Sequence, residues 1–269
     1  MTRWALLLEY DGTPFVGWQR QINGLSVQQV LEQAAANLNG AQSVASIVAG
    51  RTDAGVHAEG QVAHIDLPDG HRAKSVRDAL NYHMKPYPVA VLRACPVADD
   101  WNARFSANQR AYRFRILNRR SRPALMANRV WHVPHPLDAA AMQAAAHLLL
   151  GRHDFTSFRA ASCQAKSPIR TLDRLDIVRT DDIVEVVTEA RSFLHHQVRN
   201  FVGTLKLVGE GRWSPDRVQS ALQARDRAAA GPTAPPEGLT LIRVGYPDNP
   251  FSGQDDSATA SEVRKIPID

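Results

Sequence analysis

Apolar positions in the first part of the chain change their period several times, and each change marks a predicted element. Short apolar or alternating runs predict strands over residues 4–10, 43–49, 60–67 and 88–95. Apolar positions at helical spacing predict a helix over residues 26–38, where Ser26 is suited to the N-cap, and another over residues 75–84. The resulting order is strand, helix, strand, strand, helix, strand, which is the split βαβ or ferredoxin-like arrangement.

The same order of elements returns in the second part of the chain. Strand periodicity, clearest where aromatic residues alternate with arginines, predicts strands over residues 110–117, 174–179, 183–190 and 239–245. Helical spacing predicts helices over residues 138–150, 193–209 and 215–224. The Pro-rich stretch 228–237 is predicted to be extended.

The sequence therefore predicts an α+β protein made of two ferredoxin-like βαββαβ units. We place them at residues 1–104 and 105–250, joined into a mostly antiparallel sheet with a cleft where they meet. Residues 251–269 are polar and are predicted to form a mobile tail.

Charge changes this picture by suggesting a partner. The chain has a net charge of +5, with 27 Arg against 5 Lys, and without residues 251–269 the balance is 30 − 23 = +7. Arginine binds phosphate bidentately and stacks on bases, so an anionic partner such as nucleic acid is favoured. A GC-rich genome would also raise the Arg content, and composition alone does not separate the two explanations.

Cysteine content and hydropathy indicate in which cellular compartment the protein is expected. Cys95 and Cys163 are far apart and form neither a disulfide framework nor a zinc motif. The apolar stretch near the N-terminus is too short for a signal peptide, and no run is long enough to cross a bilayer. We expect a reduced, cytoplasmic protein without a membrane partner.

Residues 50–58, GRTDAGVHA, are the first candidate for chemistry. They follow a predicted buried strand, and Gly50 and Gly55 allow a sharp bend and a close ligand approach. Asp53 is expected on this turn beside Arg51, and a carboxylate near an arginine stays ionised, ready to act as nucleophile or base. Taken alone, the same residues fit an Asx-turn with a surface ion pair.

The whole string closely resembles the catalytic-loop motif of the tRNA pseudouridine synthase A family. Other strings resemble further landmarks of that family, in the expected order: LEYDG at 8–12, FVGWQR at 15–20, FSA at 105–107, RAYRF at 110–114, FTSF at 155–158, SPIR at 167–170, FLHHQVRN at 193–200 and APPEGL at 234–239. The resemblance covers residues 4–246. Thr240 is a departure, because an aromatic residue is expected there.

The resemblance implies that the protein isomerises uridine to pseudouridine in tRNA, on the 3′ side of the anticodon stem-loop. It implies a homodimer and no cofactor, since the atoms of the uridine are conserved. Asp53 would be the essential carboxylate, adding covalently or removing the 2′ proton, with Arg199 as its ion-pair partner. Arg51 would help hold the base out of the RNA helix. Tyr112 would stack on the base, and Leu239 would line the pocket that holds it.

Metal binding is not expected. His195 and His196 are adjacent in a predicted helix, and adjacent helical positions do not face one site. His57 and His64 lack a third ligand, so no Cys, His and carboxylate set is visible in the sequence.

A run of arginines interleaved with aromatics predicts an RNA surface: Arg110, Arg113, Arg115, Arg119, Arg120 and Arg122. Charged residues that protect a strand edge would give the same pattern. Three other functions compete with the synthase: a non-catalytic RNA-binding protein, a hydrolase that uses Asp53, and a pseudouridine synthase for a different RNA. The sequence discriminates least well against the third.

Overall fold

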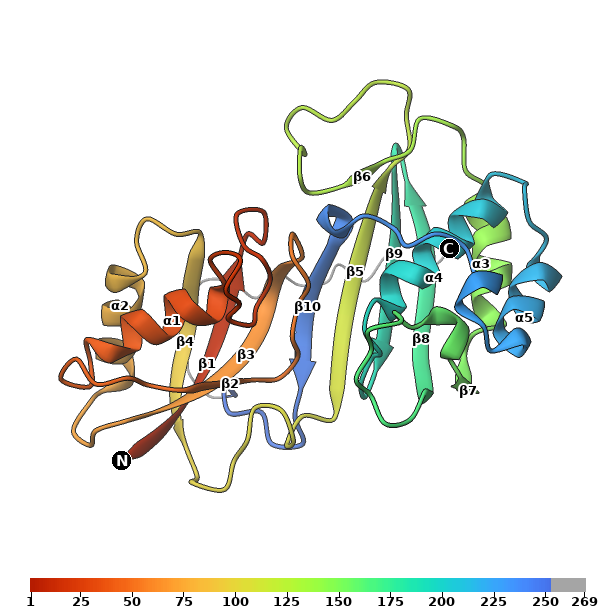
Figure 1. The fold of residues 1–269 in the computed structure, drawn as a ribbon. Helices are drawn as coiled ribbons and strands as arrows, with labels where there is room; N and C mark the ends of the chain where they lie inside the picture. The colour runs from red at the N-terminus through yellow and green to blue at the C-terminus, as the bar shows by residue number, and fades with distance from the viewer. Residues whose placement is uncertain (253–269) are drawn as a thin grey trace.

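The structure is a computed structural model that describes residues 1–252, and all of its strands belong to one sheet (Figure 1). The first part of the chain forms β1 (Thr2–Tyr10), α1 (Val27–Ala36), β2 (Ser46–Val48), β3 (His57–Leu67), α2 (Ala73–His83) and β4 (Val89–Val97). The second part forms β5 (Gln109–Leu117), β6 (Trp131–His132), α3 (Ala139–His147), β7 (Gly151–Asp154), β8 (Ile169–Thr180), β9 (Ile183–Ala190), α4 (Gln197–Gly209), α5 (Pro215–Ala224) and β10 (Leu239–Gly245), with single 3-10 turns at 156–158, 227–229 and 236–238.

The strand order is the same in both parts of the chain. The sheet runs β4-β1-β3-β10-β5-β9-β8-β7, and β2 pairs with β3 beside this path. The first four main strands are thus arranged β4-β1-β3-β2, and the second four β10-β5-β9-β8. In each set the fourth strand lies beside the first, followed by the third and the second. Neighbouring strands are antiparallel except for the pairs β3–β10 and β5–β6, so the predicted α+β fold with a mostly antiparallel sheet is confirmed.

Several predicted boundaries are wrong by three residues or more. The strand predicted over 43–49 covers only Ser46–Val48. The strand predicted over 174–179 begins already at Ile169, because much of its first half is exposed and polar and carries no apolar period. The helix predicted from residue 193 begins at Gln197, which has consequences for the site described below. The short strands β6 and β7 were not predicted at all.

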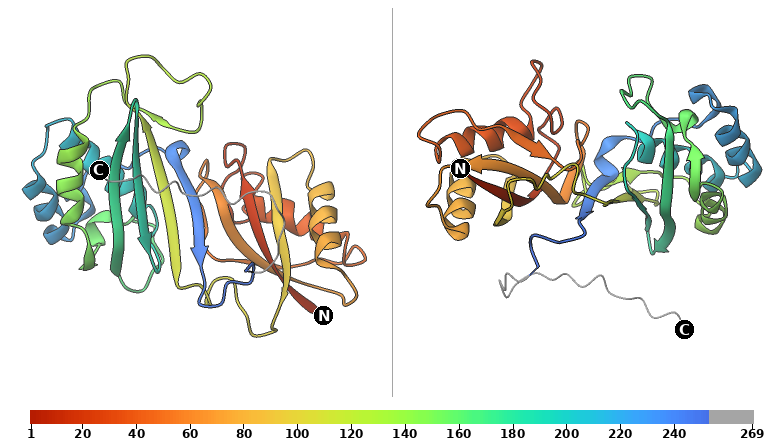
Figure 2. Two further views of the ribbon diagram at one scale, coloured as in Figure 1. Left: turned by 180° about the vertical axis from the view of Figure 1, so that it is seen from behind. Right: turned by 90° about the horizontal axis from the view of Figure 1, so that it is seen from below.

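The main core lies between the helices and one face of the sheet. Along β1 the side chains of Trp4, Leu6 and Leu8 enter this core, and the N-capped helix α1 buries Val30 and Leu31 against it. The same core continues through β5 and β9 to α3, α4 and α5, so a single hydrophobic cluster supports both parts of the chain. Figures 1 and 2 show α1 and α2 over one end of the sheet and α3, α4 and α5 over the other.

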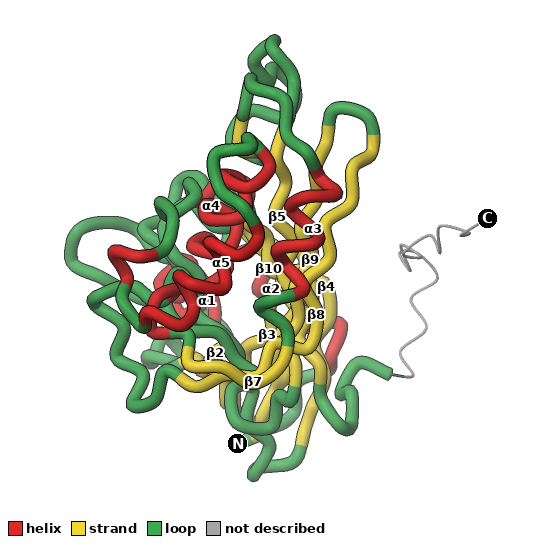
Figure 3. Tube along the Cα trace, turned by 90° about the vertical axis from the view of Figure 1, so that its right-hand side faces the viewer, coloured by secondary structure: helices red, strands yellow, loops and turns green. Residues whose placement is uncertain are grey.

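The opposite face of the sheet is partly covered. Ala5, Val62 and Cys95 pack there against Ala103 and Phe251. The carbonyl of Phe251 accepts a hydrogen bond from Arg93 at 3.0 Å, so the chain is still packed at the first residue of the predicted tail. Figure 3 shows this segment leaving the side of the molecule away from α4 and α5. Residues 253–269, the rest of that tail, lie outside the described residues, and the domain boundary at residue 104 and the cleft stay predictions.

Candidate active site

The loop that carries Asp53 is positioned by the parallel pairing of β10 with β3, which joins the two parts of the chain. Thr240 and Leu241 at the start of β10 pair with His57 and Ala58 at the start of β3. Because the two strands are parallel and pair at their first residues, the segments that precede them meet at one edge of the sheet. These segments are the loop 49–56 and the turn 236–238.

Glycines make the tight packing of this loop possible. Gly17 has φ +112°, and a Cβ there would lie 2.7 Å from the carbonyl oxygen of Thr52. Gly55 has φ +76°, and a Cβ there would lie 3.0 Å from Cγ of Pro236. Both values of φ favour glycine. The loop therefore sits between the segment after β1 and the turn before β10, with Asp53 bridged to Gly17.

The base of the loop is fixed by a buried polar network. The hydroxyls of Tyr10 and Thr52 are 2.8 Å apart, and the Gln61 amide donates to Tyr10 and to the carbonyl of Gly50 at 3.2 and 2.8 Å. Burial raises the pKa of Tyr10 to about 12, so this hydroxyl stays neutral. These contacts hold the part of the loop that precedes Asp53.

Asp53 is surrounded by three nitrogen-bearing side chains from one segment of the chain. Arg199 Nη1 donates to Oδ2 at 3.0 Å. His196 Nε2 lies 3.3 Å from the same oxygen, and His195 Nε2 lies 3.3 Å from Oδ1. Asp53 keeps 24% of its side chain exposed, while Arg199 keeps 13%. The carboxylate is thus oriented by its neighbours but still open to a ligand.

The prediction that His195 and His196 cannot face one site is wrong, because these residues precede the helix. His196 has φ +63°, a left-handed conformation, and α4 starts at the next residue. The backbone N–H of Leu194 donates to Oε1 of Gln197 at 2.8 Å, and the N–H of Gln197 donates to the carbonyl of Leu194 at 3.1 Å, so the turn before the helix is closed from both sides. The N-cap of α4 is His196, and histidine is not one of the usual N-cap residues, so local sequence did not indicate where the helix begins.

Contacts with the loop before β10 hold the start of α4 at the site. Arg199 Nε donates to the carbonyl of Ala234 at 2.8 Å, and the N–H of Ala234 donates to the carbonyl of Arg199 at 3.1 Å. Further along the helix, a Cβ at Gly203 would lie 1.8 Å from the carbonyl oxygen of Pro232. A glycine is required there for the loop to lie against α4, which sets the position of Arg199.

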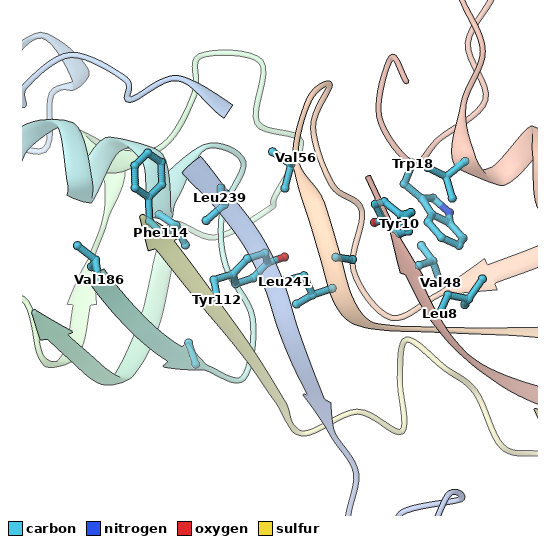
Figure 4. Close-up of a cluster of buried hydrophobic side chains, with 14 of the residues drawn as sticks. Leu8, Tyr10, Trp18, Val48, Val56, Tyr112, Phe114, Val186, Leu239 and Leu241 are labelled. Atoms are coloured by element: carbon cyan, nitrogen blue, oxygen red, sulfur yellow. The ribbon is translucent and has the colours of Figure 1, made fainter. Parts of the chain in front are cut away.

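Tyr112 lies on β5 and Leu239 on β10, two neighbouring strands beside the loop that carries Asp53. Figure 4 shows the Tyr112 hydroxyl pointing from β5 across β10 toward β3. A Cβ at Gly50 would lie 3.7 Å from this hydroxyl, so the residue reaches the start of the Asp53 loop. Tyr112 is 8% exposed and packs edge-to-face with Phe193, with ring centroids 5.3 Å apart. Leu239 is 5% exposed and pairs with Phe114.

The Tyr112 hydroxyl makes no hydrogen bond within residues 1–252, and its oxygen is not fully buried. Burial is the main cause that raises the pKa of Tyr112, and the charge of Asp53 adds to it. Tyr112 therefore differs from its core neighbours by a neutral hydroxyl, unpaired within residues 1–252, at the start of the Asp53 loop.

Arg51 is not the ion-pair partner of Asp53. Its side chain is exposed and has no ion pair within the described part of the chain, whereas Arg199, the partner that the family resemblance implies, pairs with the carboxylate at 3.0 Å. The loop 118–130 lies next to this region, because Asn128 accepts a hydrogen bond from His57 at 2.8 Å and Arg129 pairs with Asp11 at 2.8 Å.

Most of the predicted arginine run is not free to bind phosphate. Arg110 is buried and donates to the carbonyls of four residues: Ala49, Arg104, Ala107 and Arg191. Burial lowers its pKa. Arg113 pairs with Glu59 and Glu185, Arg115 with Glu185, and Arg119 with Asp182. Within residues 1–252 only Arg120 and Arg122 of this run are exposed and without an ion pair.

No helix among the described residues is long and apolar enough to span a membrane.

Comparison with known proteins identifies the family. Residues 7–106 and 145–247, more than half of the chain, match the family model described as tRNA pseudouridine synthase. The chain is 66% identical over 252 residues to the tRNA pseudouridine synthase A of Acidiphilium cryptum, which covers 93% of this chain and 99% of that protein. It is 61% identical over 246 residues to the protein of the same name from Paramagnetospirillum magneticum, covering 91% and 96%.

Among solved structures, a chain of a Cbf5-Nop10-Gar1 complex is similar with a TM-score of 0.36 and 10% identity, over 90% of this chain and half of that one. The sequence relatives carry the assignment without it, since they are matched along almost their whole length. The chain belongs to the family of tRNA pseudouridine synthases.

Proposed function

We propose that this protein converts uridine to pseudouridine in the anticodon stem-loop of tRNA, on its 3′ side, and that it does so in the cytoplasm. The observation that carries the catalytic part is the placement of Asp53. Its carboxylate is partly exposed, held by Arg199 at 3.0 Å, and lies at the junction of β3 and β10. The reaction breaks the bond from C1′ to N1 of uracil, turns the base and joins C1′ to C5.

Asp53 can serve this reaction in two ways. It can attack C1′ and form a covalent ester while the base leaves, or it can remove the 2′ proton so that the base leaves by elimination. Both routes need an ionised carboxylate. Oδ2 has two neighbouring nitrogens, from Arg199 and His196, whereas Oδ1 has only that of His195. We therefore assign the reactive role to Oδ1.

The other residues are assigned from their positions around the carboxylate. Tyr112 supplies an aromatic ring for the extruded uracil and a hydroxyl at the start of the loop that carries Asp53. Leu239 closes the apolar side of the pocket. The exposed guanidinium of Arg51 is two residues from Asp53 and helps keep the base out of the RNA stack. Isomerisation conserves all atoms, so we propose no cofactor.

The direct test is to incubate the protein with unmodified tRNA transcripts and to map pseudouridine. We expect the modification at uridines on the 3′ side of the anticodon stem-loop. Pseudouridine formed only in another RNA would contradict the proposed tRNA substrate but would support the proposed isomerisation reaction. Binding of tRNA without any pseudouridine would instead favour a non-catalytic RNA-binding protein.

Affinity for tRNA should fall steeply with salt. Each phosphate contact releases counterions, and Arg120 and Arg122 are available for such contacts on the loop next to the site. Replacing both by Gln should weaken binding and lower the slope of log affinity against log salt by up to about two. Filter binding over a salt series measures this slope.

Arg212→Gln provides the control, because Arg212 lies beyond the end of α4 that is remote from Asp53. An unchanged slope in the double variant, equal to that of Arg212→Gln, would place the tRNA elsewhere.

We also propose a homodimer, on the basis of the family resemblance. Two subunits can hold the body of a tRNA away from the uridine that is modified. Sedimentation at micromolar concentration should give twice the chain mass of 29.7 kDa. A fully active monomer would show that the second subunit is not needed.

A further inference from the structure

The cluster that surrounds Asp53 also has the composition of a metal site. One ligand atom each from Asp53, His195 and His196 lies within 4.8 Å of the others. Two imidazoles and one carboxylate form a ligand set that suits Zn²⁺ and similar transition metals, whereas Mg²⁺ prefers oxygen ligands. The sequence did not indicate this set, because it depends on the turn before α4.

The ligand atoms lie close to the spacing that a zinc ion requires. Zinc binds nitrogen and oxygen at about 2.0 Å, so two ligands of a tetrahedral ion lie about 3.3 Å apart. His195 Nε2 lies 3.3 Å from Oδ1 of Asp53 and His196 Nε2 lies 3.3 Å from Oδ2, and the three ligand atoms lie within 4.8 Å of one another. A small rotation of these side chains is enough to bring one atom of each around a single ion.

The two histidines of the cluster are accessible to solvent, and His195 has a further hydrogen-bonding neighbour. His195 and His196 are 41% and 28% exposed, so an ion can enter from solvent. Nδ1 of His195 lies 3.3 Å from the hydroxyl of Ser162, which can accept the proton that a metal-bound imidazole keeps on that nitrogen. The positive charge of Arg199 beside Oδ2 repels a metal cation, so we expect the binding of the metal to be weak enough to be reversible.

We propose that Asp53, His195 and His196 bind one Zn²⁺ ion and that this ion inhibits the enzyme by occupying the carboxylate that the uridine requires. The inhibition rests on the function proposed above, but the binding does not. Mg²⁺, which tRNA needs for folding, should not compete, because it takes oxygen ligands.

Binding is tested with Co²⁺ on untagged protein without RNA. Co²⁺ in a tetrahedral site absorbs visible light, so the protein should develop one equivalent of this absorption, which Zn²⁺ removes and millimolar Mg²⁺ does not. The absorption should be lost in Asp53→Asn, and the affinity should fall by roughly tenfold or more in His195→Gln and His196→Asn. Asn is chosen at 196 because it tolerates the left-handed backbone there.

His83→Gln is the control, since this exposed histidine ends α2, far from the cluster. It should behave as the unchanged protein does. Absence of the absorption from the unchanged protein, or its persistence in all three cluster variants, would overturn the site whatever the activity.

The effect on turnover is measured separately, with the integrity of the tRNA checked after incubation. Micromolar Zn²⁺ should inhibit pseudouridine formation in the presence of Mg²⁺, and EDTA should restore it. His83→Gln should be inhibited equally. A protein that shows the Co²⁺ absorption but keeps full activity with Zn²⁺ bound would refute the inhibition and count against Asp53 as the catalytic group. A protein inactive in all conditions that still binds Co²⁺ would count against the proposed function alone.

Discussion

Asp53→Asn should lose pseudouridine formation almost completely, by roughly 10⁴-fold or more in turnover, as replacement of an essential catalytic group does. Asparagine keeps the shape of the side chain, and its carbonyl oxygen can still accept the hydrogen bond from Arg199. It has no charge with which to attack C1′ or remove a proton. Single-turnover assays with excess enzyme measure this loss without the influence of product release.

Binding of tRNA by Asp53→Asn should be nearly unchanged, because phosphate contacts supply most of the affinity. The fold should persist as well, since Arg199 is still held by the carbonyl of Ala234. Asp173→Asn removes the same charge from an exposed position of β8 and should be fully active. Substantial turnover by Asp53→Asn would contradict the proposed mechanism by either route.

Tyr112→Leu should lose roughly 5- to 150-fold in turnover. A base that leaves the RNA stack recovers about 1–3 kcal/mol by stacking on an aromatic ring. A change of about 1.4 kcal/mol in the activation free energy changes the rate tenfold. Leucine provides neither ring nor hydroxyl. It also gives up the edge-to-face contact with Phe193, so its melting temperature must be measured alongside its activity.

Tyr112→Phe separates the ring from the hydroxyl. The hydroxyl has no hydrogen-bond partner within residues 1–252, so its removal leaves no group unpaired there and should not destabilise the protein. We expect Tyr112→Phe to bind tRNA normally and to be slowed after base detachment, because the hydroxyl lies at the start of the loop that carries Asp53 and we assign to it a part in removing the C5 proton. Rapid turnover by Tyr112→Phe would assign stacking alone to this residue.

Unimpaired turnover by Tyr112→Leu would remove both roles and return Tyr112 to the core, where its 8% exposure already places it.

Local patterns in the sequence determined most of the elements. Strand and helix periods depend on which residues face the core, and this alternation is present in the sequence itself. Tyr112, Phe114 and Ile116 therefore predicted β5, and Ser26 with Val30 and Leu31 predicted α1. The repeated order of elements predicted two ferredoxin-like units, whose strand orders are indeed the same.

The sequence also determined where to look for chemistry. The strings around Asp53 and Arg199 resemble one family in the expected order, and the comparisons place the chain in that family. Such strings indicate which residue types take part in the reaction, but not how they are arranged in space. The resemblance implied that Arg199 pairs with Asp53, but it did not indicate that His195 and His196 also contact the carboxylate.

Only the tertiary structure decided which residues meet. Arg51 is two residues from Asp53 in sequence yet is exposed, while His195 and His196 come from a segment far along the chain and contact its carboxylate. The parallel pairing of β3 with β10 and the left-handed turn at His196 bring them together. Arg110 shows the same limit, because its four carbonyl partners come from distant segments as well as near ones. Contacts of this kind depend on how elements pack against each other, and the period of a single element does not contain that information.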